Sequence, residues 1–228
     1  MIDANNWILT LVDKLKITFK ETLLFVGLQG SYQRGEATEN SDIDIMVVLE
    51  NLGTDELATY KRIISDMPYN EKACGFISGK KELLSWPKFE IFQLAHETKP
   101  YYGELKNLIP EIKQKDIIDS IRISASGIYH AACHSYLYDD KDKSIISLKE
   151  FYKGAFFLLQ MLYYIHKGIY VHTKKELFPL LCDLNKEILS ISLQWNNNIV
   201  QNKDNLNFFY DKIIKWTSNI LIHDFKTN

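Results

Sequence analysis

Two aspartates separated by one residue, Asp42 and Asp44, are the side chains in this sequence best suited to chemistry. They open an apolar run that predicts a β-strand, and residues i and i+2 of a strand point to the same face. The two carboxylates should therefore project together, close to the Gly30-Ser31 turn that precedes them. Paired carboxylate oxygens suit a magnesium ion that also holds phosphates. The pattern predicts a site for Mg²⁺ and a phosphorylated ligand.

The glycine-serine turn has its own physical use at such a site. Gly30 lets the backbone come close to a ligand, and consecutive amide groups of a turn can cradle phosphate oxygens. The hydroxyl group of Ser31 can reach a terminal phosphate, and Arg34 is a candidate for a further phosphate contact. We expect Asp42 and Asp44 to hold one or two magnesium ions that bridge a triphosphate and neutralise its charge.

Composition indicates an ordinary globular protein of 228 residues, with 46% hydrophobic and 25% charged residues. The formal net charge of -2 does not indicate a nucleic-acid binder. The cysteines, Cys74, Cys133 and Cys182, match neither a disulfide framework nor a zinc motif. We expect a soluble, cytoplasmic protein that does not enter a membrane. The N-terminus lacks a signal-peptide pattern, and the most apolar run, residues 155–165, is too short to span a bilayer.

The elements that must position these side chains change character after Pro100. Before it, a helix near residues 5–19 is followed by strand patterns at 22–28, from Asp42 onward, at 72–78 and at 89–94. After it, helical patterns occupy 112–138, 144–166, 183–194 and 205–222. We predict an α+β fold, with a mixed sheet and flanking helices in residues 1–105 and an all-α helical bundle in residues 106–228.

The string GSYQRGEATENSDIDIMV resembles the signature of the polymerase-β-like nucleotidyltransferase superfamily, a glycine-serine turn followed by Asp-x-Asp. It is similar in particular to minimal nucleotidyltransferases and to kanamycin-type aminoglycoside nucleotidyltransferases. A helical second half also occurs in the antibiotic-modifying members. The resemblance implies Mg-dependent transfer of a nucleoside monophosphate from an NTP to a hydroxyl group of a small molecule, with pyrophosphate leaving.

The resemblance also implies a third carboxylate from a neighbouring strand, which would complete the metal site. Glu90, at the start of the expected strand FEIFQL, is the favoured candidate, and Glu97 is the alternative. If neither lies at the metal, nucleotide binding without efficient transfer becomes one of the open outcomes. In the helical half, Glu150 is the candidate general base for the acceptor hydroxyl.

Two other functions stay open. Minimal nucleotidyltransferases often act as antitoxin partners of small helical toxins, and some relatives have lost activity. An antitoxin-like or regulatory nucleotide-binding protein, with a protein partner, is therefore one alternative. A transferase that acts on protein or RNA is the other, although the sequence has no basic patch that would favour nucleic acid. The identities of the acceptor and of the nucleobase do not follow from the sequence.

Overall fold

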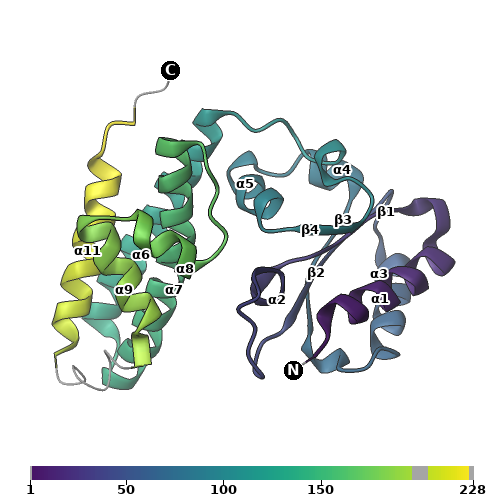
Figure 1. Ribbon diagram of the computed structural model, residues 1–228, viewed down its shortest axis with the longest axis horizontal. Helices are drawn as coiled ribbons and strands as arrows, with labels where there is room; N and C mark the ends of the chain where they lie inside the picture. The colour runs from purple at the N-terminus through teal and green to yellow at the C-terminus, as the bar shows by residue number, and fades with distance from the viewer. Residues whose placement is uncertain (1, 197–204, 226–228) are drawn as a thin grey trace. The chain divides into compact units, whose positions relative to one another are not determined.

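The computed structural model describes residues 2–196 and 205–225. The chain divides into two compact units, Met1–Ile112 and Lys113–Asn228 (Figure 1). The first unit combines a sheet with helices, and the described part of the second is helical. The predicted fold class, a mixed sheet with flanking helices followed by an all-α region, is confirmed.

The first unit contains helices and strands in the following chain order. They are α1 (Ala4–Phe19), β1 (Leu23–Leu28), α2 (Gly30–Arg34), β2 (Ile43–Leu49), α3 (Thr54–Ser65), β3 (Ala73–Gly79), α4 (Lys80–Leu84), α5 (Lys88–His96) and β4 (Lys99–Tyr102). The strands form one four-stranded sheet in the order β3-β2-β1-β4. The sheet is mixed, because β2 pairs with β3 in parallel while β1 pairs with β2 and with β4 in antiparallel fashion.

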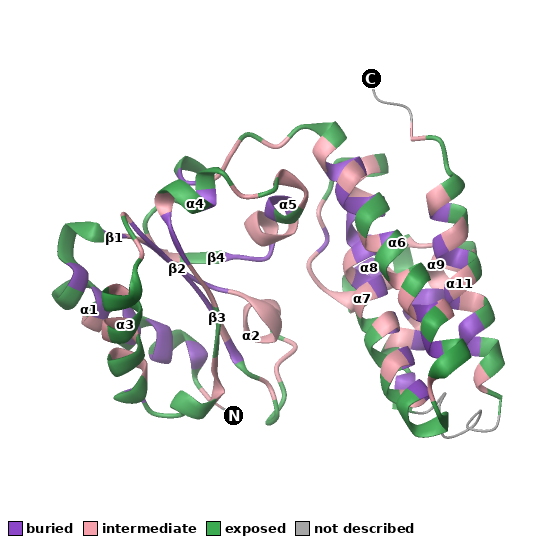
Figure 2. Cartoon of the chain, turned by 180° about the vertical axis from the view of Figure 1, so that it is seen from behind, coloured by how far each residue is buried: buried purple, intermediate pink, exposed green. Residues whose placement is uncertain are grey.

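The two central strands of the sheet, β1 and β2, are buried along most of their length (Figure 2). Ile43, Ile45 and Val47 of β2 pack into a cluster with the apolar stripe of α1, while Met46 and Val48 belong to a second cluster with residues of α4 and α5. This alternation is the side-chain period of a strand. It makes β2 a rigid central element, and both aspartates lie at its start.

The second unit is built from α6 (Gln114–Tyr138), α7 (Lys141–Lys167), α8 (Lys174–Leu177), α9 (Asp183–Leu193) and α11 (Leu206–Ile222). Helix α6 packs against α7 and α11, and α7 also contacts α9. Large aromatic side chains fill the space between them, among them Tyr152, Phe156, Phe209 and Trp216, all nearly inaccessible to solvent. Across the described residues, no helix is both long enough and apolar enough to cross a membrane.

One predicted strand is wrong. The segment 89–94 lies within helix α5, and the fourth strand is β4, further along the chain. Ile91 and Phe92 are adjacent and both buried, which suits a helix packed on a sheet rather than an alternating strand. Pro100 argues against a strand at β4, but β4 is an edge strand that pairs only with β1, so the N–H that proline lacks is not needed by a second neighbour.

Candidate active site

The Gly30-Ser31 turn lies directly against Asp44. The backbone N–H of Gln29 donates a hydrogen bond of 2.8 Å to the carbonyl oxygen of Asp44. Gly30 has φ +66°, and a Cβ atom built on it would overlap the Asp44 carboxylate, with Cγ only 2.8 Å away. Glycine is therefore required here twice, for its left-handed backbone and for the close approach. The predicted turn is the first turn of the short helix α2.

The two aspartates lie at the entrance to β2. Asp42 immediately precedes the strand and is exposed, whereas Asp44 is its second residue and is partly buried. Ile43, between them, is completely buried in the cluster that contains α1. Because side chains alternate along a strand, Asp44 points to the face opposite Ile43. The arrangement leaves carboxylate oxygens accessible next to the turn at Gly30.

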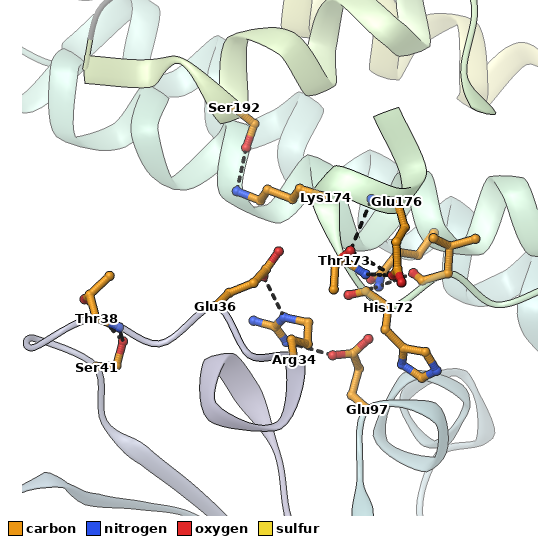
Figure 3. Close-up of polar contacts among 12 residues, drawn as sticks. Arg34, Glu36, Thr38, Ser41, Glu97, His172, Thr173, Lys174, Glu176 and Ser192 are labelled. Carbon is orange, nitrogen blue, oxygen red and sulfur yellow. Dashed lines mark hydrogen bonds and ion pairs between the residues drawn. The ribbon is translucent and has the colours of Figure 1, made fainter. Parts of the chain in front are cut away.

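Arg34, the last residue of α2, is held by two carboxylates (Figure 3). Its Nη1 donates to Glu97 Oε2 at 2.7 Å, and its Nε donates to Glu36 Oε2 at 3.1 Å. The side chains of Arg34 and Glu97 are only 12% and 9% exposed. Burial by itself lowers the pKa of Arg34, but the hydrogen bonds and charges of Glu97 and Glu36 outweigh it and raise the pKa overall.

Residues 11–123 match the protein family described as the nucleotidyltransferase domain. They contain the turn, both aspartates and the Arg34–Glu97 pair. This part of the chain is a nucleotidyltransferase domain. Among curated proteins, no sequence matches the chain.

A solved structure shares the fold of this chain. The crystal structure of spectinomycin adenyltransferase AAD(9) from Enterococcus faecialis, with ATP and spectinomycin, matches at a TM-score of 0.52 and 16% sequence identity. The match covers 90% of this chain and 97% of that one, so it includes helical as well as sheet-containing parts. A toxin-antitoxin structure with AMP-PNP is 19% identical and covers 61% of this chain and 98% of its own, at a TM-score of 0.32.

In this nucleotidyltransferase domain, neither strand beside β2 supplies an acid. The segments of β1 and β3 are LLFVGL and ACGFISG, and the partner of Asp44 on β3 is Cys74. The sequence-based expectation of a third carboxylate on a neighbouring strand is therefore not met. The sheet contributes carboxylates to the site only from the start of β2.

Glu90, the favoured third carboxylate, lies in the first turn of α5 and not at the start of a strand. Its side chain is exposed and accepts a hydrogen bond of 2.6 Å from Trp86 Nε1. Within residues 2–196 and 205–225, no three His, Cys, Asp or Glu side chains gather as a group that could hold a metal ion. The structure thus does not bring Glu90 together with Asp42 and Asp44.

The residues present nevertheless fit magnesium. Mg²⁺ prefers oxygen ligands and is usually bound by one or two carboxylates together with substrate phosphates, rather than by a complete cage of protein ligands. Asp42 and Asp44 provide that number and that chemistry, and the carboxylate of Asp44 is held against the backbone of the turn. A third protein carboxylate is therefore not a requirement for binding.

Other sequence candidates have ordinary surroundings. Glu150, the candidate base of the helical half, is an exposed residue of α7 and pairs with Lys153 at 3.5 Å within one turn. Such exposed pairs contribute little to stability and indicate no special environment. Glu97, the alternative third carboxylate, is instead the partner of Arg34. Sequence reasoning missed this pairing, because the two residues are 63 positions apart and no local pattern connects them.

Proposed function

We propose that this chain transfers a nucleoside monophosphate from an NTP to a hydroxyl group of a small molecule, with magnesium, and releases pyrophosphate. The nucleotidyltransferase domain supplies the type of reaction. The observation that supports the proposal most strongly is the carboxylate of Asp44 against Gly30, with Asp42 beside it at the start of the same strand. This places hard oxygen ligands next to backbone amides, the two groups that an Mg-bound triphosphate needs.

Each residue has a distinct role in the proposed reaction. Asp42 and Asp44 would hold the magnesium, which when bound neutralises charge on the triphosphate. The turn at Gly30 and Ser31 binds terminal phosphate oxygens through its amides and the serine hydroxyl. The acceptor hydroxyl releases its proton to water, and its oxygen forms a bond to the α-phosphorus as the bond to pyrophosphate breaks. Catalysis comes from positioning and charge stabilisation.

For the acceptor, a small hydroxylated molecule is the first class to test. The adenyltransferase that shares this fold across 90% of the chain was solved with ATP and spectinomycin. A formal net charge of -2 gives no general attraction to nucleic acid. ATP with hydroxyl-rich aminocyclitols and aminoglycosides is therefore the initial substrate panel.

The test compares wild-type protein with Asp42→Asn and Asp44→Asn. Each substitution should lower Mg-dependent pyrophosphate release by on the order of 100-fold or more, because a ligand that stabilises developing charge is lost. Thermal unfolding should change little, because both carboxylates lie at the edge of the packed strand. Asp13→Asn, which removes an exposed carboxylate from α1, is the matched control and should keep full activity.

Unchanged Mg-dependent nucleotide affinity in both variants would refute the proposed site. Nucleotide binding that depends on Asp42 and Asp44, but without turnover on any acceptor, would favour a regulatory nucleotide-binding protein instead. The role of Glu90 as a third ligand stays a prediction. If it is correct, Glu90→Gln will lower turnover more than nucleotide affinity. Trp86→Phe, which removes the hydrogen bond to Glu90 but keeps its carboxylate, is the control.

A further inference from the structure

Helix α2 is attached at both ends to one short segment, Glu97-Thr98, which leads from α5 into β4. At its start, Gln29 Nε2 donates to Thr98 Oγ1 at 2.7 Å. At its end, Arg34 Nη1 donates to Glu97 Oε2 at 2.7 Å. Gly30 and Ser31 lie between these two attachments. The turn that faces Asp44 is therefore held by two consecutive residues from a distant part of the chain.

The Glu97-Thr98 segment is itself firmly placed. Both residues are buried, at 7% and 8% exposure. The backbone N–H of Glu97 donates to Gln93 O at 2.8 Å, and the hydroxyl of Thr98 donates to Leu94 O at 2.5 Å. Both contacts close the last turn of α5, which packs on the sheet through Ile91. The segment is thus well ordered, and α2 is bound to it by a hydrogen bond at one end and an ion pair at the other.

The surroundings of Arg34 argue for a structural task. Two of its nitrogens already meet carboxylates, and the pair with Glu97 is shielded from solvent. Breaking a buried ion pair from one side is strongly destabilising, because the desolvation of the remaining charge is no longer offset. If Arg34 left this pair to bind a phosphate, the carboxylate of Glu97 would stay buried without the cation that now faces it. The geometry favours keeping the pair intact.

We propose that Arg34 is a positioning residue: through Glu97 it fastens α2 to the α5–β4 junction and so holds Gly30 against Asp44 in the arrangement that receives an Mg-bound triphosphate. The inference rests on the proposed nucleotide site, and it assigns Arg34 a role through Glu97 in place of the direct phosphate contact expected from the sequence. Gln29, at the other end of α2, acts in the same way through Thr98.

A double-mutant cycle distinguishes the two roles of Arg34. Arg34→Gln and Glu97→Gln each break the buried ion pair from one side, and each should weaken Mg-ATP affinity by on the order of tenfold. The double variant Arg34→Gln/Glu97→Gln removes both charges of the pair, and its two amides can still hydrogen-bond. Its affinity should return to within about threefold of wild type, a coupling that direct phosphate binding by Arg34 does not produce.

Direct phosphate binding by Arg34 predicts a different pattern. The double variant would then bind as weakly as Arg34→Gln, and Glu97→Gln alone would keep wild-type affinity. That result would overturn the proposal. Lys80 and Glu50 form the matched control pair, 3.4 Å apart with side chains 38% and 42% exposed. Lys80→Gln and Glu50→Gln should change affinity by no more than about twofold, because exposed ion pairs contribute little.

Amide hydrogen exchange of the ligand-free protein provides a readout that needs no nucleotide. Residues 29–36 should exchange faster in Arg34→Gln and in Glu97→Gln, and should regain protection in the double variant. If the wild type fails to bind Mg-ATP, the proposed function is wrong, while the exchange data still test the positioning role. Unchanged exchange in both single variants would overturn that role even if the protein is an active transferase.

Discussion

The carboxylate of Asp44 occupies the space that a Cβ atom would take at Gly30. The first turn of α2 and the start of β2 therefore fit together only when residue 30 is glycine. The contact is reinforced by the backbone hydrogen bond from Gln29 to the carbonyl of Asp44. The metal-binding carboxylate and the phosphate-binding turn of the proposed site are thus one structural unit.

Gly30→Ala tests this relationship. The added methyl group must displace the Asp44 carboxylate, so we expect Mg-dependent turnover to fall by on the order of 100-fold, as small misplacements at catalytic groups do. Gly35→Ala is a well-matched control. Gly35 also has a left-handed backbone, at φ +70°, but a Cβ atom added there would meet nothing within 4 Å. Both substitutions share the backbone cost of roughly 1–2 kcal/mol. Equal losses of turnover would show that the contact with Asp44 is unimportant.

The fold of the first unit depends on the buried stripe of α1. Leu11 is completely buried in the cluster beneath the sheet, whereas Leu9 of the same helix is 51% exposed. Leu11→Ala should lower the free energy of unfolding by about 2–5 kcal/mol, because it leaves a cavity. Leu9→Ala should stay within about 0.5 kcal/mol of wild type. Denaturant unfolding measures both, and similar losses would contradict the burial of Leu11 beneath the sheet.

The stability that the connection between α6 and α7 contributes should depend on pH. The hydroxyl groups of Ser135 and Ser147 donate to Asp139 Oδ2, at 2.6 and 2.9 Å, and the bond from Ser135 foremost lowers the pKa of Asp139. A carboxyl group whose pKa is lower in the folded state stabilises the protein above its unfolded pKa of about 3.9. That contribution is lost as the pH falls through the folded-state pKa.

Asp139→Asn should therefore unfold at a lower temperature than wild type near neutral pH. The difference should shrink below about pH 4, as the wild-type carboxyl group becomes protonated. Asp142→Asn, which removes an exposed carboxylate from the first turn of α7, controls for the loss of one negative charge. A difference between Asp139→Asn and wild type that persists unchanged in acid would contradict the assignment.

The second unit contains a buried hydrogen bond that can be removed with little change of shape. Tyr152 is 1% exposed, and its hydroxyl donates to the carbonyl oxygen of Phe209 at 2.9 Å. Tyr152→Phe should lower the free energy of unfolding by about 1 kcal/mol. Tyr136→Phe, at a site 51% exposed, should have almost no effect.

Burial, with a smaller effect from Asp211, raises the pKa of Tyr152, so the hydroxyl remains a donor in alkaline solution. Early ionisation of Tyr152 in a spectroscopic titration would contradict this environment.

Sequence patterns were most informative where a local period and a distinctive pair of residues coincided. Alternating apolar residues after Asp42 predicted β2, and its buried side chains follow that alternation. The helical half followed from long stretches of helical period, each of which contains several turns. The segment 89–94 is too short for a strand period to be distinguished from a helical one. It forms part of helix α5, which packs against the sheet. Strand β4 was missed because Pro100 is acceptable only at an edge, and sequence alone does not reveal which strand lies at the edge.

The sequence by itself therefore determined the type of domain and the two aspartates with their glycine-serine turn, because all of these are encoded within one short stretch of chain. The partners of the other charged residues were decided by the tertiary structure. Glu90 lies on a helix beside Trp86, while Glu97 meets Arg34 across 63 positions of sequence. Such pairings arise only when the sheet and α5 pack together, since the contact depends on where distant elements meet and not on any local period.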